Sequence, residues 1–291
     1  MAGVARDEKQ LGQYIPLHYH FNMLTDIARM QGFKAALEKK VPAGGKVLEL
    51  GGGTGVLSFF AASRASKVWC VERNPELVQA ARYFRTLNPQ SAKVEIIAGD
   101  ALEFLPPIPV DVVVCEMLHS ALLREKQIQV IRSFKERYHK KFATLPVFIP
   151  EATLLAVQPV QQSFNFCGYY APVPIFHHPM LEQGNTVEMA APWVYHTLDY
   201  GQDFASHYSC NTKIVIQTPG HLNALKFITK NILAILVPEN QTIDWFNQNL
   251  IIPVPVPMKV NAGDAIRVRF SYEAGDSLDA LIGSLKVKLL K

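Results

Sequence analysis

The chain of 291 residues lacks the features that mark membrane and secreted proteins. No apolar run reaches about 18 residues, so no transmembrane helix is predicted. The first ten residues, MAGVARDEKQ, contain no apolar core of a secretory signal. The four cysteines (Cys70, Cys115, Cys167 and Cys210) are far apart and form no C-x-x-C pair, so neither a metal site nor a disulfide framework is indicated. Because Cys70 and Cys115 lie in apolar runs, we expect buried free thiols in a protein of the reducing cytoplasm.

Concentrated charge is also absent. The formal net charge is +4, and the basic residues are dispersed apart from a mild cluster around Lys135, Arg137, Lys140 and Lys141. A solvated helix face explains that cluster, and no basic stripe of the kind that follows a nucleic-acid backbone is present. We therefore expect no membrane partner and no nucleic-acid partner.

A glycine-rich turn between two apolar runs is the most informative feature that is present. Residues 47–58 read VLELGGGTGVLS, and Glu72 closes the next apolar run, KVWCVE. Glycine has no Cβ atom, so the backbone at Gly51, Gly53 and Gly55 can turn sharply and approach a ligand closely. Glu72 can accept hydrogen bonds from two ribose hydroxyls. This order of strand, glycine turn, helix and acidic strand end is how an α/β sheet holds an adenosine-containing ligand.

The spacing of the glycines separates two classes of ligand. A dinucleotide fingerprint needs G-x-G-x-x-G, which would place glycine at position 56, where Val56 stands. The loop is instead G-x-G-x-G, which resembles the first motif of class I S-adenosylmethionine methyltransferases. That resemblance implies S-adenosyl-L-methionine as the cofactor, with Glu49, Ala101 and Glu116 as further contacts. A plain tight turn is the alternative interpretation of the glycines.

Short apolar runs alternate with helical patterns through the first half of the chain. Apolar positions recur at helical spacing over 22–40, and a second helix is predicted from Asn74-Pro75 onward. Strands are predicted at 47–50, 68–71, 94–97 and 112–115, and a further helix at about 122–141. Such alternation predicts a parallel sheet with helices on both faces. The fold class is therefore α/β, with a Rossmann-like domain over residues 1–150.

The pattern changes near Pro146–Pro150, and β-type runs dominate from residue 151 to 291. Turn signals such as Ala262-Gly263-Asp264 separate the last of them. This half predicts an antiparallel, barrel-like or sandwich domain. Residues 164–195 are aromatic and proline-rich and fit neither half, so they are interpreted as a long insertion.

Three further stretches, in this order, resemble the protein arginine methyltransferase family. MLTDIAR places Arg29 six residues after Met23, CEMLHSALLRE separates Glu116 from Glu125 by nine positions, and IDWFNQNLIIPV carries Trp245 within the β-rich half. That family has a helix beginning M-L-x-D-x-x-R, a loop with two glutamates after the fourth strand and a C-terminal β-barrel. The resemblance covers roughly residues 18–160 and 195–290.

Departures from the family pattern concern the acceptor side. Met117, Leu118 and His119 stand where the family has W-M-G, and Asp244 replaces the histidine before the barrel tryptophan. The segment at 164–195 stands where the family has its dimerisation arm, and it is shorter.

The resemblance assigns roles to named residues of the cofactor half. Arg29 would pair with the methionine carboxylate of the cofactor through a bidentate guanidinium, and an exposed helix arginine is the alternative. Asp100 would lie near the adenine amino group, and a strand-end aspartate at a turn is the alternative. Asp244 could form an ion pair with Arg29 or with another helix residue.

Glu116 and Glu125 are the candidate catalytic residues. Two carboxylates that face one pocket can bind a guanidinium through paired, charge-assisted hydrogen bonds. Close carboxylates also raise each other's pKa, so one of them can accept a proton at neutral pH. The alternative is that Glu125, flanked by Arg124 and Lys126, makes a surface ion pair on a solvated helix. His119 is either a base in the same loop or an incidental loop histidine.

Three functions remain open at this point. The first is a methyltransferase that acts on a cationic guanidino or amino nitrogen of a protein. The second is methylation of a small metabolite or a peptide natural product, favoured by the altered W-M-G segment. The third is a non-catalytic scaffold with the same fold. A homodimer is expected because Phe164, Tyr169, Tyr170 and Phe176 offer more apolar surface than an exposed loop normally keeps.

Overall fold

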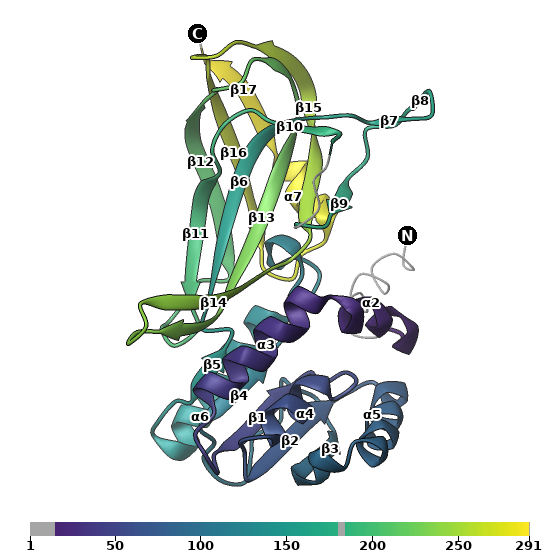
Figure 1. Ribbon diagram of the computed structural model, residues 1–291. Helices are drawn as coiled ribbons and strands as arrows, with labels where there is room; N and C mark the ends of the chain where they lie inside the picture. The colour runs from purple at the N-terminus through teal and green to yellow at the C-terminus, as the bar shows by residue number, and fades with distance from the viewer. Residues whose placement is uncertain (1–14, 180–183, 291) are drawn as a thin grey trace, which may run out of the picture.

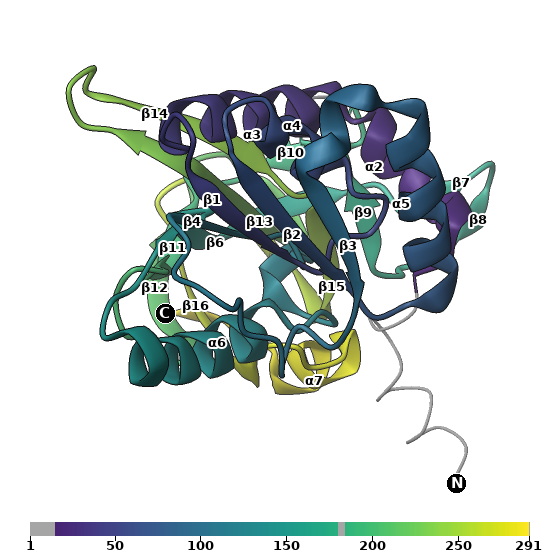
Figure 2. The same cartoon turned by 90° about the horizontal axis from the view of Figure 1, so that it is seen from below.

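Helices and parallel strands alternate through the first half of the chain in the computed structural model, which describes residues 15–179 and 184–290. The strands form one parallel sheet in the order β3-β2-β1-β4-β5, with α3, α4 and α5 on one side and α6 on the other (Figure 2). The four predicted strands are confirmed, and β5 is a fifth strand that the apolar pattern did not indicate. The elements are, in chain order, η1 (Leu17–Tyr19), α2 (His20–Thr25), α3 (Ile27–Lys40), β1 (Lys46–Leu50), α4 (Val56–Ala62), β2 (Lys67–Glu72), α5 (Pro75–Leu87), η2 (Pro89–Lys93), β3 (Val94–Ala98), β4 (Val112–Cys115), η3 (Ser120–Leu122), α6 (Gln127–Phe142) and β5 (Val147–Ile149).

The strand order creates a crevice at the carboxyl edge of this sheet. β1 pairs with β2 on one side and with β4 on the other, and Leu50 lies opposite Cys115 in the β1–β4 register. The order of the strands reverses here, so the chains that leave β1 and β4 diverge and a ligand can bind between them. The glycine loop (residues 51–55) follows β1, and the segment that we call the glutamate loop (residues 116–126) follows β4.

Two of the predicted helices are interrupted. The region 22–40 is split at Asp26, whose backbone is extended and whose side chain accepts a hydrogen bond from the Arg29 N–H as the N-cap of α3. The helix expected at about 122–141 begins only at Gln127, because the residues before it include left-handed backbone conformations. The start of α5 at Asn74-Pro75 is confirmed, since the Asn74 side chain caps Glu76 N–H at 3.0 Å.

The second half is antiparallel throughout. One seven-stranded sheet contains the path β10-β6-β13-β15-β9, with β11 paired to β6 and β14 paired to β13, and a three-stranded sheet has the order β12-β16-β17. Figure 1 shows these strands as a curled, barrel-like layer above the parallel sheet. The fold is therefore a Rossmann-like domain followed by a β-rich, barrel-like one. Its elements are β6 (Ala152–Gln162), β7 (Asn165–Phe166), β8 (Tyr169–Tyr170), β9 (Ile175–His177), β10 (Thr186–Glu188), β11 (Trp193–Asp199), β12 (His207–Val215), β13 (Gly220–Leu236), β14 (Gln241–Phe246), β15 (Asn249–Val260), β16 (Ala265–Glu273), α7 (Leu278–Ser284) and β17 (Lys286–Leu290).

The insertion expected at 164–195 is wrong in its extent. β9 pairs with β15, β10 pairs with β6, and β11 pairs with β6 from Trp193 onward. Of the described residues in this segment, those of the β7–β8 hairpin project from the barrel (Figure 1). Short strands broken by prolines gave no clear period-2 pattern, which hid their membership of the sheet.

The two halves share one apolar core. Residues of both, such as Phe33, Leu48, Leu225 and Trp245, belong to the same buried cluster, and Lys40 of α3 pairs with Glu151 beside the barrel at 2.6 Å. Parallel pairing ends with β5 and antiparallel pairing begins with β6, so we retain residue 150 as the proposed boundary between domains 1–150 and 151–291.

The cysteines and the lengths of the helices can also be compared with the sequence analysis. Cys70 and Cys115 are buried free thiols, as predicted. Within residues 15–179 and 184–290, no helix is long and apolar enough to cross a membrane.

Candidate functional site

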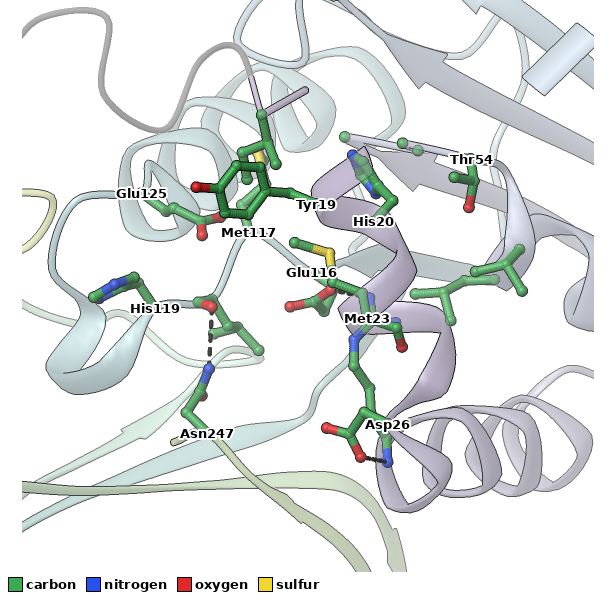
Figure 3. A pocket seen from close by; sticks show the side chains of 18 of the residues that line it. Tyr19, His20, Met23, Asp26, Thr54, Glu116, Met117, His119, Glu125 and Asn247 are labelled. Atoms are coloured by element: carbon green, nitrogen blue, oxygen red, sulfur yellow. Dashed lines mark hydrogen bonds and ion pairs between the residues drawn. The ribbon is translucent and has the colours of Figure 1, made fainter. Parts of the chain in front are cut away.

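A cavity of about 840 Å³ lies at the carboxyl edge of the parallel sheet. Its wall is formed by the N-terminal helices, the glycine loop, the glutamate loop and the β14–β15 turn of the barrel. Figure 3 shows side chains of this wall, with Glu116 and Glu125 on the glutamate loop and His20 and Met23 on α2. The cavity therefore brings together sequence segments from both halves of the chain.

The glycine loop forms one side of the cavity through its backbone. Gly53 has a left-handed backbone (φ +54°), and a Cβ atom there would lie 2.8 Å from the ring of His20. Gly52 lies against β2 so closely that a Cβ atom would be 2.2 Å from the Cys70 sulfur. Gly51 and Gly53 line the cavity, whereas Gly55 begins α4 outside its wall. At Gly52 and Gly53, a larger residue would displace its neighbours.

Glu72 is held at the rim of the glycine loop by backbone groups. Its carboxylate accepts hydrogen bonds from the N–H of Gly53 at 2.8 Å, of Arg73 at 2.8 Å and of Asn74 at 2.7 Å. A carboxylate offers about four acceptor positions, so about one remains for a ligand hydroxyl. Glu72 thus fixes the loop and also lines the cavity.

Glu49 is a buried carboxyl in the floor of the cavity. It accepts hydrogen bonds from the backbone N–H of Ser58 at 2.9 Å and from the Ser58 hydroxyl. Burial raises the pKa of Glu49 from 4.5 to about 7, against the opposing effect of these hydrogen bonds. The protonated form of Glu49 is therefore populated near neutral pH, and in that form the group can both donate and accept.

Asp100 and Ala101 follow β3 and line the far end of the cavity. One Asp100 oxygen accepts from the Leu102 N–H at 2.9 Å, and the other pairs with the Arg73 guanidinium at 3.1 Å. The turn contacts of the strand-end alternative are therefore present, together with a position on the cavity wall.

Arg29 forms an ion pair with Glu116 inside the cavity. Its guanidinium also lies 5.6 Å from the ring centroid of Phe33 and 6.0 Å from that of Trp245. Only 6% of Arg29 is exposed, so the alternative of an exposed helix arginine is wrong. Asp26 holds this region in place, because it caps α3 and accepts a hydrogen bond from the Trp245 indole at 3.2 Å.

Glu116 and Glu125 line the same cavity, as the sequence predicted. Burial, with a smaller contribution from the negative charge of Glu116, raises the pKa of Glu125 from 4.5 to about 8. Glu125 is half-buried and precedes α6 rather than lying on it. The alternative of a surface ion pair with Arg124 or Lys126 on a solvated helix is therefore wrong.

His119 and Asp244 have clear positions near the site. The ring of His119 meets Phe176 edge-on at 5.4 Å between centroids, and burial lowers the pKa of His119 from 6.5 to about 4. His119 is thus neutral at pH 7. Asp244 pairs with Lys230 of the neighbouring strand at 2.6 Å, so the expected ion pair with Arg29 or a helix residue is wrong.

Several residues of the cavity wall were not identified from the sequence. His20 is the clearest case, since its Nε2 atom is buried without a hydrogen-bond partner and burial lowers its pKa. Tyr19, Met23 and Met117 also line the cavity, as does Asn247, whose amide donates to the Leu118 carbonyl at 3.1 Å (Figure 3). Met23, Met117 and Asn247 stand in stretches that resemble the family but were assigned no ligand contact, whereas His20 and Tyr19 stand in no pattern that marks one.

Comparisons with known proteins agree with this geometry. Residues 47–140 match the family model of the methyltransferase domain. An uncharacterized protein of Methanocaldococcus jannaschii is 28% identical over 93% of this chain and 96% of its own length. The arginine N(omega)-methyltransferase of Streptomyces achromogenes is 34% identical over 42% of this chain and 35% of its own length.

Solved structures of similar fold cover nearly the whole chain. The Trypanosoma brucei PRMT1 enzyme–prozyme heterotetrameric complex with AdoHcy gives a TM-score of 0.71 at 15% identity, covering 94% of this chain and 97% of that one. Arabidopsis thaliana protein arginine methyltransferase 10 gives 0.73 at 17% identity, covering 89% and 88%. These likenesses establish the fold. In sequence, the matched part spans about a third of the length of the curated arginine methyltransferases.

Proposed function

On the premise that this chain is a divergent S-adenosylmethionine-dependent methyltransferase related to the protein arginine methyltransferases, we propose that it methylates a guanidino nitrogen. The observation that supports this most directly is the position of Glu116 and Glu125, which line the same cavity as the glycine loop and Glu72. The glycine loop and Glu72 thus suit an adenosine-containing cofactor, and the two glutamates in the same cavity suit a cation.

The residues present fit S-adenosylmethionine. The His20 Nε2 atom is a buried polar group without a partner on the cavity wall, and Glu72 retains about one acceptor position for a ribose hydroxyl. Gly51 and Gly53 would contact the methionine portion, while Asp100 and Ala101 lie where the adenine would end. When bound, the cofactor supplies a methyl group already activated by the positive sulfonium.

Arg29 has donors to spare for the carboxylate of the cofactor. A guanidinium has five N–H donors, and here one nitrogen faces Glu116 while the other faces the Met23 carbonyl at 3.4 Å. We propose that Arg29 serves the cofactor carboxylate with its remaining donors. Only one oxygen of Glu116 faces Arg29, so its other oxygen is available to an acceptor.

Glu116 and Glu125 would grip the acceptor guanidinium. Paired, charge-assisted hydrogen bonds from two carboxylates orient a planar cation and hold its positive charge away from the reacting nitrogen. The lone pair of that nitrogen forms the new bond to the methyl carbon as the bond from carbon to sulfur breaks, and the nitrogen loses a proton. With a pKa of about 8, most of Glu125 is protonated at neutral pH in the free chain. A bound guanidinium favours the ionised carboxylate, which can then accept that proton. Alignment and exclusion of water supply most of the remaining rate.

Free arginine or another small guanidino compound is a second candidate acceptor. It is favoured by the similarity to the Streptomyces arginine N(omega)-methyltransferase. Met117, Leu118 and His119, which replace W-M-G, line the same cavity and distinguish the acceptor side from the family pattern.

An incubation with labelled cofactor tests both candidates. The purified chain is mixed with methyl-labelled S-adenosylmethionine and either L-arginine or an arginine-containing peptide, and the products are analysed by mass spectrometry. Label on a guanidino nitrogen supports the proposal and identifies the acceptor. Calorimetry that shows no binding of S-adenosylhomocysteine, together with binding of NAD, contradicts it.

We also propose a cytoplasmic homodimer. Phe166, Tyr169, Tyr170 and Val173 of the β7–β8 region are exposed, and they form an apolar projection. Phe164 and Phe176 do not contribute, because both pack within the chain, so their expected place on a dimer surface is wrong. A second, apolar cavity of about 250 Å³, lined by residues of α4, α5 and β3, offers a complementary surface in another copy.

A further inference from the structure

The glutamate loop has a strained backbone. Ala121, Leu122 and Arg124 have φ values of +57°, +56° and +63°, in the left-handed region that side chains other than glycine rarely adopt. Three such residues within four positions persist only where the surrounding structure holds them. The contacts of the loop therefore decide where Glu116 and Glu125 point.

The barrel supplies hydrogen bonds to the strained residues. The Ala121 N–H donates to the Thr229 hydroxyl at 2.7 Å, and the Tyr272 hydroxyl donates to the Ala121 carbonyl at 2.9 Å. The turn after β16 continues the contact, since Gly275 N–H donates to the Leu122 carbonyl at 2.8 Å and Arg124 N–H donates to the Asp276 carbonyl at 2.8 Å. Each left-handed residue is thus bonded to the barrel through its own backbone.

A buried polar chain inside the barrel extends these contacts. Asn247 donates to the Leu118 carbonyl at 3.1 Å and accepts from Asn231 at 2.8 Å, and Asn231 accepts from Thr153 at 2.9 Å. The Thr153 and Tyr200 hydroxyls are 3.0 Å apart. All four side chains are buried, and a fully satisfied network of this kind in a low-dielectric interior is rigid.

Gln127 holds the other end of the loop. Its side-chain amide donates to the Cys115 carbonyl at 2.7 Å, and its carbonyl oxygen accepts from the Met117 N–H at 2.9 Å. These two groups flank Glu116. The backbone of Glu116 is therefore fixed from α6, whereas the backbone between the two glutamates is fixed from the barrel.

We propose that the barrel acts as a template for the glutamate loop and holds it in the shape in which both glutamates face one cavity. Thr229 and Tyr272 are positioning residues in this arrangement, because they act on the acceptor site only through the backbone of Ala121. The consequence for catalysis rests on the proposed function, whereas the effect on the loop does not.

Thr229→Val tests the proposal, because it keeps the shape of the side chain and removes the acceptor for the Ala121 N–H. Thr229→Ser restores a hydroxyl, and Thr212→Val is the matched control, since Thr212 is a buried threonine of β12 in the other sheet. Hydrogen exchange of the Ala121 and Leu122 amides and an NMR titration of Glu125 need no acceptor. Methyl transfer and S-adenosylhomocysteine binding are measured in parallel.

Thr229→Val should speed exchange at Ala121 by about tenfold or more, the equivalent of one lost hydrogen bond. It should also lower the pKa of Glu125 as the loop relaxes away from its buried position beside Glu116, and reduce kcat with cofactor affinity unchanged. Thr229→Ser should restore these values, and Thr212→Val should leave them unaltered. The proposal is overturned if the exchange rate at Ala121 and the titration of Glu125 in Thr229→Val equal those of the wild type.

Tyr272→Phe is an independent test if Thr229→Val does not fold, since it removes the hydroxyl that donates to the Ala121 carbonyl, together with the bond of that hydroxyl to the Tyr195 hydroxyl at 2.7 Å. Wild-type exchange at Ala121 in a folded Tyr272→Phe protein likewise overturns the proposal. If the wild-type chain transfers no methyl group to any acceptor but the exchange and titration respond as expected, the proposed function fails and the template stands.

Discussion

Arg29 and Glu116, which are 87 positions apart in sequence, form a buried ion pair across the cavity. The pair joins the residue proposed for the cofactor carboxylate to one of the two proposed for the acceptor. Breaking a buried pair by removing one partner is costly, because the remaining charge is left without compensation. The two halves of the site are therefore coupled, and substitutions at either residue affect both.

Cofactor binding should depend on Glu72. Glu72→Ala should weaken binding of S-adenosylhomocysteine by roughly 1–3 kcal/mol, because a hydrogen bond to a charged acceptor is lost and the Gly53 amide loses its partner. Isothermal titration calorimetry measures the change. Glu76→Ala, at an exposed position on α5, removes the same charge nearby and should bind normally. Equal affinities in the two variants would contradict the role of Glu72.

The free energy of unfolding should depend on pH through the ionisation of Glu49. Its folded-state pKa is raised from 4.5 to about 7 by burial, so the native state binds the proton more tightly than the unfolded chain does. The free energy of unfolding should therefore fall as pH rises from 4.5 to about 7, and the lost stability should not return above that range. Urea denaturation across this range measures it. Glu49→Gln, which cannot ionise, should reduce the slope, while Glu125, whose pKa burial raises to about 8, keeps its own contribution over the same range. An unchanged slope in Glu49→Gln would contradict the assignment.

Methyl transfer should increase with pH through the pKa of Glu125. Glu125 must be ionised to bind the guanidinium of the acceptor, and burial raises the pKa of Glu125 to about 8. The value of kcat/KM should therefore rise as the pH approaches 8 and then level off, while the affinity for S-adenosylhomocysteine changes little over the same interval. A pH–rate profile that is flat from neutral pH upward would argue against Glu125 as an acceptor ligand.

The β7–β8 hairpin should control the oligomeric state. Tyr169 and Tyr170 are 74% and 59% exposed, so replacing both with serine should leave thermal stability unchanged and shift a dimer toward monomer. Val256→Ser, at a position of β15 that is 68% exposed, is the control and should remain dimeric. Sedimentation velocity distinguishes the species. A wild-type chain that is monomeric at tens of micromolar contradicts the dimer itself.

The parts of the site that follow from local sequence were predictable. The glycine loop, Glu72 and the two glutamates stand at fixed short distances from strands, and strand order then brings them to one edge of the sheet. The ends of the helices were harder to predict from the sequence. The break at Asp26 and the late start of α6 come from tertiary contacts that override helical periodicity.

The contacts that unite the two halves were not predictable. The Trp245 indole reaches Asp26 across 219 positions, and Thr229 reaches Ala121 across 108. A tryptophan or threonine on a strand has no pattern that distinguishes such a contact from ordinary packing. The same applies to His20, whose position over Gly53 depends on how α2 folds across the glycine loop.

Methyl transfer by the wild-type chain, Glu116→Gln and Glu125→Gln tests the proposed function most directly. Each substitution keeps the shape of the side chain and removes its charge, so the interaction with the acceptor and the transition state is lost. Glu116→Gln also loses the ion pair with Arg29. Mass spectrometry with labelled cofactor and the acceptor identified for the wild type gives the rates, and calorimetry gives the affinity for S-adenosylhomocysteine. Each variant should lose most transfer and Glu125→Gln should bind the cofactor normally, with non-additive effects in the double variant. Full activity of Glu125→Gln would contradict the account.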